Sequence, residues 1–285
     1  MAEMQNIQWF PGHMAKAERN IKSQLPLVDA VVEIIDSRIP VSSRNPDLSK
    51  IIENKPRIIV LNKCDMADEK ETKKWVEFYE SQGITALTVD CKTGKGIKSF
   101  APAVKKVLDG KLESYRQKGM VGKTLRVMVV GIPNVGKSTF INRISGGTKA
   151  KVENRPGVTK GNQWYSIDKE LDLLDTPGVL WPKFEDKLVG EHLAFIGSVK
   201  SEVIDIELLG LRICEFLAEN YPEMIEERYK LSPDGLDGYE LMCAIGKKRG
   251  FVIRGGETDE ERTAKMIADE FKNGIIGRIT IEKVL

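Results

Sequence analysis

The sequence of 285 residues has few of the side chains that build metal clusters and disulfide frameworks. It contains two histidines, His13 and His192, and four cysteines, none of which forms a Cys-x-x-Cys pair. A disulfide scaffold, a zinc ribbon or a histidine-built metal centre is therefore not expected. No apolar run approaches the roughly 18 residues of a membrane helix, and the first residues lack the pattern of a secretion signal. We expect a cytoplasmic protein with reduced thiols and no membrane partner.

A strong charge of one sign is also absent. Lys and Arg total 44 and Asp and Glu total 42, so the formal net charge is +2. Bulk charge therefore neither favours nor excludes a nucleic-acid partner. The composition, with 41% hydrophobic and 30% charged residues, is that of a globular protein and not of a disordered chain. The length corresponds to about two domains.

Apolar runs of strand length alternate with amphipathic stretches of helix length over the first 175 residues. Runs rich in β-branched residues are typical of a mostly parallel sheet, so we predict an α/β domain with helices on both faces. The expected strands are 28–35, 57–61, 84–89, 125–130, 163–167 and 171–174. The expected helices are 47–53, 68–81, 96–108 and 137–144.

The strand signal fades after about residue 190, and helical patterns follow. The expected helices here are 204–220, 222–231, 238–248 and 259–272. We therefore predict an α/β domain over residues 1–190 and a small all-helical domain over residues 191–285. Within the first domain, the basic stretch of about 109–124 is expected to be a linker, either solvated or in contact with a phosphate backbone.

A phosphate-binding loop is the strongest motif in the chain. Residues 131–139, GIPNVGKST, fit G-x-x-x-x-G-K-[ST] between an expected strand and an expected helix. Backbone N–H groups of such a loop surround phosphates, the lysine reaches the β- and γ-phosphates, and the first hydroxyl binds Mg²⁺. The expected nucleotide contacts are Gly131, Asn134, Val135, Gly136, Lys137, Ser138 and Thr139.

Two further segments complete the expected phosphate and magnesium site. Asp175 and Gly178 belong to a D-T-P-G box at the end of the strand 171–174, where the Asp can help hold Mg²⁺ and the Gly N–H can contact a γ-phosphate. Thr159, in the segment 154–159, is a candidate for closing on Mg²⁺ when the γ-phosphate is present. The expected magnesium ligands are Ser138, Thr159 and Asp175.

Two short boxes earlier in the chain predict a guanine site. An N-K-C-D box ends the strand 57–61, and its Asp can accept hydrogen bonds from guanine N1–H and N2–H₂, a pair that adenine lacks. A second loop ends the strand 84–89 and can offer a backbone N–H to guanine O6. The residues of the two boxes are Asn62, Lys63, Cys64, Asp65, Asp90, Cys91 and Lys92. GTP and GDP are therefore the expected ligands.

The order of these motifs is unusual, because the base boxes precede the phosphate loop, whereas ordinary GTPases have them after it. Two interpretations are possible. In the first, the base box is accidental and the chain is another P-loop enzyme, such as an ATPase. In the second, the GTPase domain is circularly permuted. The position of both boxes at strand ends favours the permuted GTPase.

These residues resemble the circularly permuted bacterial GTPases of the YlqF/RbgA type, the ribosome biogenesis GTPase A family, over nearly the whole chain. The shared motifs are WFPGHMAKA from Trp9, DSRIP from Asp36, NKCD, GIPNVGKST, PGVT and DTPG. Asp90 and Cys91 depart from the usual Ser-Ala. The resemblance implies a cytoplasmic factor of late assembly of the large (50S) ribosomal subunit, whose helical domain contacts ribosomal RNA. Ribosomal proteins are further expected partners, and DNA is not.

The residue that orients water in ordinary GTPases is missing. Val179 occupies the position of their glutamine, so slow hydrolysis stimulated by a partner is expected. His13 stands where a helix is expected to begin. A histidine there can be structural or can orient water, and the resemblance implies the catalytic role. Asn134 suits a turn, but related GTPases with a hydrophobic substitution imply that it helps to hold an activating K⁺ ion.

Two further alternatives stay open at this stage. The protein can be a GTP-gated RNA- or ribosome-binding module in which turnover is incidental. In the helical domain, the segment 247–254 offers four cations and an aromatic residue, which suits either RNA contact or a solvated loop. Residues 195–285 hold 13 basic and 18 acidic side chains, so RNA binding there would need a local face.

Overall fold

The computed structural model describes residues 11–120, 122–147, 163–180, 186–199 and 204–284. Of residues 11–15 it describes the backbone but not the side chains. The chain forms two compact units, one of residues 8–183 with 280–285 and one that includes residues 184–279. The sequence predicts a division at residue 190 and assigns the end of the chain to the helical part. The structure instead returns residues 280–285 to the first unit, because the backbone of this tail bonds to residues near strand β1.

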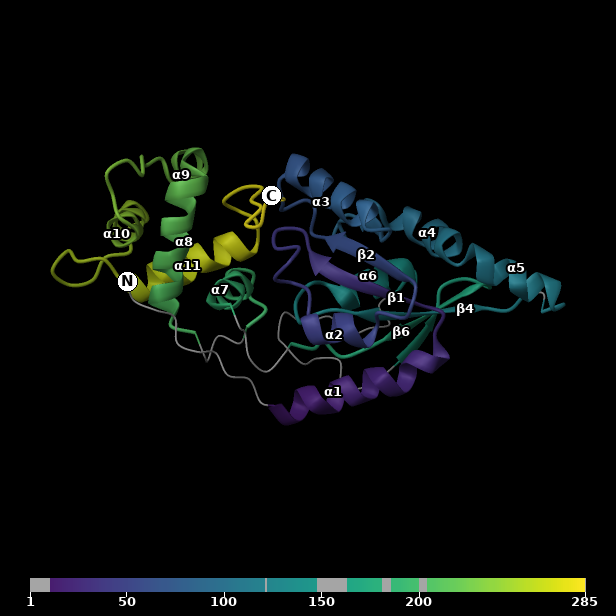
Figure 1. The fold of residues 1–285 in the computed structure, drawn as a ribbon. Coiled ribbons are helices and arrows are strands. Elements are labelled where there is room, and N and C mark those ends of the chain that lie inside the picture. The colour runs from purple at the N-terminus through teal and green to yellow at the C-terminus, as the bar shows by residue number, and fades with distance from the viewer. Residues whose placement is uncertain (1–10, 121, 148–162, 181–185, 200–203, 285) are drawn as a thin grey trace. The chain divides into compact units, whose positions relative to one another are not determined.

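A sheet forms the centre of the first unit, with β1, β2, β4 and β6 labelled in Figure 1. It has six strands in the order β3-β2-β1-β4-β6-β5. All neighbours are parallel except β5 and β6, which are antiparallel. The mostly parallel α/β sheet predicted from the apolar runs is therefore confirmed. The strands are β1 (Ala30–Asp36), β2 (Arg57–Asn62), β3 (Thr85–Thr88), β4 (Leu125–Val130), β5 (Gln163–Ser166) and β6 (Leu171–Asp175).

Strand β1 joins the two halves of the sheet. It pairs with β2 on one side and with β4 on the other, so it lies between the strands that carry the base boxes and those that carry the phosphate motifs. All seven of its residues are buried, which fits a central strand. Asp36 pairs in register with Asn62, and both lie at the carboxyl ends of their strands. Parallel strands of an α/β sheet bind ligands at this edge.

Helices surround this sheet. Their bounds are α1 (Pro11–Gln24), the 3-10 turn η1 (Leu25–Leu27), α2 (Pro46–Ile51), α3 (Glu69–Ser81), the 3-10 turn η2 (Ile97–Ser99), α4 (Phe100–Val107), α5 (Asp109–Gln117) and α6 (Lys137–Ile144). Ile21 of α1 and Leu48 of α2 pack with Val31, Met128 and Leu174 of the sheet. A second cluster places Trp75 and Tyr79 of α3 on β1, β2 and β3.

Helix α5 occupies residues 109–117 of the stretch 109–124, for which the composition predicts a basic linker. Lys111 forms an ion pair with Asp29, and Lys123 lies over the ring of Tyr115 with its Nζ 4.4 Å from the ring centre. The ion pair with Asp29 holds the helix against the rest of the unit. A count of basic residues cannot reveal such partners, since Asp29 lies far away in the sequence.

The second unit is helical in its described residues. It contains α7 (Lys187–Phe195), α8 (Ile206–Asn220), α9 (Pro222–Tyr229), α10 (Gly238–Lys248) and α11 (Glu260–Lys272). Helices α8 and α11 approach closely at Gly210, where a Cβ atom would lie 2.6 Å from Ala264 Cβ. Glu270 accepts hydrogen bonds from Arg228 and Tyr229 and anchors α9 on α11. In the part of the chain described here, no helix is both long and apolar enough to cross a bilayer.

Candidate nucleotide-binding site

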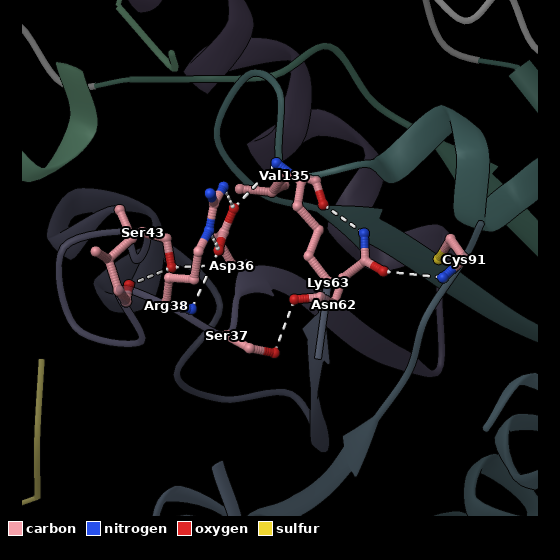
Figure 2. Close-up of polar contacts among 9 residues, drawn as sticks. Asp36, Ser37, Arg38, Ser43, Asn62, Lys63, Cys91 and Val135 are labelled. Atoms are coloured by element: carbon pink, nitrogen blue, oxygen red, sulfur yellow. Dashed lines mark hydrogen bonds and ion pairs between the residues drawn. The ribbon is translucent and has the colours of Figure 1, made fainter. Parts of the chain in front are cut away.

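Asn62 connects the two base boxes and the phosphate loop. Its side-chain Nδ2 donates to the carbonyl of Val135 at 2.7 Å, and its Oδ1 accepts from the backbone N–H of Cys91 at 3.3 Å (Figure 2). The side chain is buried, so both bonds are shielded from water. Gly136 packs so closely here that a Cβ atom would lie 2.3 Å from Asn62 Nδ2. Three segments that are far apart in the sequence therefore meet at one amide.

Lys63 is held by a buried carboxylate. Its Nζ lies 3.0 Å from Asp36 Oδ2, and Arg38 binds both oxygens of Asp36 at 2.9 Å (Figure 2). Burial alone would raise the pKa of Asp36, but the charges of Arg38 and Lys63 hold it well below its usual range. Asp36 is therefore a fixed negative charge that orients the lysine of the base box.

The second base loop is shaped by Asp90. This buried side chain accepts from the backbone N–H of Lys92 at 2.7 Å, from that of Thr93 at 3.2 Å and from the Thr93 hydroxyl. Burial raises the pKa of Asp90, but these hydrogen bonds outweigh it and hold the pKa below its usual value. The geometry makes Asp90 a loop-forming residue, and the nucleotide contact that the sequence predicts for it stays a prediction.

The two base loops also present side chains to solvent. Asp65 and Lys92 are exposed, so the carboxylate expected to bind guanine N1–H and N2–H₂ is accessible. Cys64 contributes its backbone N–H to the carbonyl of Val89 at 3.3 Å, which ties the two base loops together. The Cys91 thiol is buried, and burial raises its pKa to about 12.

The phosphate loop has the backbone conformation that the motif requires. Asn134 and Gly136 both adopt positive φ, at 64° and 97°. Gly131 has no room for a side chain, since a Cβ atom would lie 2.4 Å from the carbonyl of Ile34. Gly136 caps helix α6, so Ser138 and Thr139 lie in its first turn, at the end where N–H groups bind anions.

Lys137 is buried at the centre of this loop. Its Nζ donates to the carbonyls of Gly131 at 3.0 Å and Ile132 at 2.8 Å. Burial lowers the pKa of Lys137 to about 8, although the charge of Asp175 acts in the opposite direction. A Cβ atom at Gly178 would lie 2.9 Å from this Nζ, so the D-T-P-G box reaches the phosphate loop.

Asp175 is the buried carboxylate at the end of β6. Its Oδ1 has no hydrogen-bond partner among the described residues, and burial raises its pKa to about 6 despite Lys137 and the N–H of Thr176. The described residues hold no group of three His, Cys, Asp or Glu side chains suited to a metal. One orphaned carboxylate oxygen fits Mg²⁺, which prefers oxygen ligands and completes its shell with water and phosphate oxygens.

Three positions that bear on hydrolysis have different outcomes. Val179 is buried in the cluster that contains Ile21 of α1, and its N–H donates to the carbonyl of Gly131 at 3.3 Å. It is a packing residue. His13 lies in helix α1, which begins at Pro11, but its side chain is outside the described residues. Thr159 lies outside them as well.

Three residues that shape the site are not among those that the sequence predicts. Arg143 on α6 binds the backbone of the second base loop. Asp36 and Arg38 belong to the D-S-R-I-P motif, which was a family signature without an assigned role. A signal for Asp36 existed in the sequence, because a carboxylate that ends a buried strand needs a cationic partner. Nothing in the sequence connects Arg143 to a loop about 50 residues earlier.

Comparisons with known proteins agree with this geometry. The sequence profile of a family described as 50S ribosome-binding GTPase matches residues 126–227. Ribosome biogenesis GTPase A of Priestia megaterium is 46% identical over 97% of this chain and 96% of its own length, and that of Thermotoga maritima is 37% identical over 97% and 94%. The crystal structure of GNP-bound YlqF from T. maritima superposes with a TM-score of 0.65 at 32% identity, covering 94% of this chain and 98% of that one.

Proposed function

This chain belongs to the family of ribosome biogenesis GTPase A and is a GTPase, and from that premise we propose that it is a late assembly factor of the large (50S) ribosomal subunit. In this proposal the protein is cytoplasmic and binds GTP with Mg²⁺. It docks on the maturing subunit, where contact with the subunit stimulates hydrolysis. The observation that carries the nucleotide site is the position of Asn62, which bonds at once to the phosphate loop and to the second base loop.

The GTPase domain is circularly permuted in this proposal. Strands β2 and β3 carry the base boxes and come with β1 in the first part of the chain, whereas β4 and β6 carry the phosphate motifs and come later. Pairing of β1 with β4 places the two groups side by side in one sheet. The base and phosphate boxes therefore share one ligand edge although their order in the sequence is reversed.

Magnesium would be held by Asp175, Ser138 and Thr159. When bound with GTP, this ion neutralises charge on the phosphate oxygens and orients them. The support from this chain is the orphaned Oδ1 of Asp175, which lies near Lys137 at the end of β6. Lys137 would turn from its own loop carbonyls to the β- and γ-phosphates, since the two bonds it makes now are replaceable by phosphate oxygens.

Hydrolysis would depend on groups outside the D-T-P-G box, because Val179 is buried and cannot bind water. We assign this part to His13. The support for this assignment is helix α1, which carries both His13 and Ile21. Ile21 packs in the same cluster as Val179, and His13 lies eight residues before it, about 12 Å along the same helix. Asn134, with its positive φ, would help to hold an activating K⁺ ion.

Contact with ribosomal RNA and ribosomal proteins is assigned to the helical unit. The segment after α10 forms a tight turn in which the N–H of Ile253 donates to Glu257 O at 2.9 Å. Val252 and Ile253 are exposed at this turn, close in sequence to Lys247, Lys248 and Arg254. Phe251 is stacked under Arg262, 4.1 Å from ring centre to guanidinium carbon. Because Arg262 covers the ring of Phe251, the cations of this segment are better suited to contact RNA than the ring is.

A GTP-gated binding module is the competing function. In that case the GTP form would occupy its site on the subunit, and turnover would be incidental. His13→Ala separates the two. Normal docking and normal cellular function without hydrolysis would favour the module, whereas loss of function together with hydrolysis favours the assembly GTPase.

The first experiment is steady-state hydrolysis of GTP and ATP with and without purified large subunits, in K⁺ and in Na⁺ buffer. We expect slow GTP turnover that rises sharply with large subunits and rises further in K⁺. Small ribosomal subunits are the matched control. GTP turnover that ignores large subunits would reject the partner, and a preference for ATP would reject the base site.

A further inference from the structure

Arg143 lies in the last turn of helix α6, the helix that follows the phosphate loop. Its guanidinium group donates from Nε to the carbonyl of Cys91 at 3.1 Å and from Nη2 to the carbonyl of Lys92. Its aliphatic part also packs against the loop, since a Cβ atom at Gly94 would lie 3.7 Å from Arg143 Cδ. One side chain therefore connects the phosphate-loop helix to the second base loop.

The two carbonyls that Arg143 binds belong to two consecutive peptide groups. The N–H ends of the same peptide groups are those of Lys92 and Thr93, and both donate to Asp90 Oδ1. Each peptide group is thus bound at its carbonyl end by a cation and at its N–H end by an anion. Hydrogen bonds to charged groups are stronger than those between neutral groups, so this arrangement fixes the planes of both peptides.

We infer that Arg143 and Asp90 form a clamp that positions the second base loop to recognise guanine O6. Arg143 is a positioning residue for nucleotide specificity in this arrangement and does not itself touch the nucleotide. The inference rests on the base site of the proposed function. It adds a residue that base recognition would otherwise lack, and it places that residue on the helix that binds the phosphates.

The clamp explains how the N–H of Cys91 can be available at the correct angle. That N–H now makes a long bond of 3.3 Å to Asn62 Oδ1, while the peptides on its carboxyl side are held by the clamp. A loop fixed in this way loses little conformational freedom when O6 binds. A loop without Arg143 could rotate its peptide groups, and the contact with O6 would weaken.

The test compares diphosphate nucleotides that differ at O6. GDP and inosine diphosphate both carry O6, whereas 6-thio-GDP keeps the N1–H and N2–H₂ donors for Asp65 and replaces O6 by sulfur, a weak acceptor. Affinities are measured by calorimetry for the wild-type full chain, Arg143→Gln and Arg143→Lys. We expect Arg143→Gln to weaken GDP and inosine diphosphate by about tenfold and 6-thio-GDP by less than about twofold, since one hydrogen bond is affected.

Arg143→Lys should recover part of the loss, because an ammonium group can bind one carbonyl but not both. Arg116→Gln is the matched control, as Arg116 is exposed on α5 and pairs only with the neighbouring Glu113 in the described structure. An equal loss for all three nucleotides would show a general structural role and overturn the clamp, as would no loss at all. A wild-type protein that binds GDP no better than ADP would instead reject the base site itself.

Discussion

The two halves of the nucleotide site differ in how far the protein completes them without a ligand. In the base half, Asn62, Lys63 and Asp90 all bind partners within the chain. In the phosphate half, Lys137 bonds to carbonyls of its own loop and Asp175 Oδ1 has no hydrogen-bond partner in the described chain. The base half is preorganised, whereas the phosphate half depends on its ligand.

The pKa shifts show the same contrast. Asp36 has its pKa lowered by two cations, so its charge is stabilised in the fold. Asp175 has its pKa raised to about 6 and Lys137 has its pKa lowered to about 8, so burial disfavours both charges. Charges that burial disfavours in the protein alone become favourable when phosphates and Mg²⁺ supply partners. Base recognition therefore costs little reorganisation, while phosphate binding relieves an existing penalty.

The largest effect is expected from Asp65→Asn, which changes the exposed carboxylate of the N-K-C-D box. Replacing a carboxylate by an amide removes an acceptor for guanine N1–H or N2–H₂, so GDP affinity should fall by about 1,000-fold. The exposure of Asp65 predicts no change in thermal stability. Xanthosine diphosphate, which carries an acceptor at C2, should bind the variant better than the wild type. Unchanged GDP affinity would mean that the base half is not where we place it.

Lys137→Met and Asn62→Ala form a matched pair that tests the contrast between the halves. Both should weaken GTP binding, by about 100-fold for Lys137→Met because a charged phosphate contact is lost. Removing the buried ammonium should leave the free energy of unfolding of the nucleotide-free protein almost unchanged, because the lost hydrogen bonds are offset by the lost burial penalty. Asn62→Ala should lower that free energy by about 2 kcal/mol, since it leaves two buried partners unsatisfied.

Urea unfolding of both nucleotide-free variants measures this difference. Equal destabilisation by the two substitutions would remove the distinction between a completed half and a ligand-dependent half.

The stability of the nucleotide-free protein should also depend on pH through Asp175. Its folded pKa of about 6 exceeds the ordinary value of 3.8, so between these values the folded state binds more protons than the unfolded state. The free energy of unfolding should therefore fall as pH rises from about 4 to about 6, by roughly 2 kcal/mol. Lys137 acts in the opposite direction above about pH 8, where stability should rise with pH.

Urea unfolding with a chelator at pH 4.5 and pH 7 tests this expectation in the wild type and in Asp175→Asn. The substitution should remove the fall across this range, and identical pH profiles of the two proteins would contradict it. Asp168→Asn is a suitable control, because Asp168 lies near the same strand but has no cluster of buried charges around it.

Much of the fold could be predicted because its signals are local. The apolar runs predict all six strands within two residues at each end. The bounds of β4, Leu125–Val130, are those predicted. Helix α8 ends at Asn220, also as predicted, where Pro222 begins the next helix. The phosphate loop and the base boxes could be located for a similar reason, since each is a short motif at the end of a strand.

The remaining features depend on contacts between distant segments. Helix α5 is stabilised by Asp29, Arg143 reaches a loop about 50 residues away, and the end of the chain returns to β1. None of these has a periodic pattern or a motif of its own. Hydrogen bonds to backbone carbonyls are especially hard to predict from sequence, because every residue offers the same acceptor.

The smallest effect is expected from a change in the tail of the chain, residues 280–284, which supports the base half of the site. The N–H of Ile281 donates to Arg38 O at 2.8 Å, and the carboxylate of Glu282 accepts from the N–H groups of Val41 and Ser42 at 2.6 and 3.0 Å. Arg38 in turn binds Asp36, which holds Lys63. Glu282→Ala should therefore lower the free energy of unfolding by about 1 to 2 kcal/mol, because charged hydrogen bonds are lost.

The same change should weaken GDP binding by only about two- to threefold, since the tail acts on the base box through two intermediate residues. The affinity for inorganic pyrophosphate should stay at its wild-type value, because the tail has no contact with the phosphate half in the described residues. Lys283→Ala is the adjacent control, as Lys283 is exposed. If Glu282→Ala weakened the binding of GDP and of pyrophosphate equally, the tail would support both halves of the site. The difference between a preorganised and a ligand-dependent half would then not apply to the residues that support them.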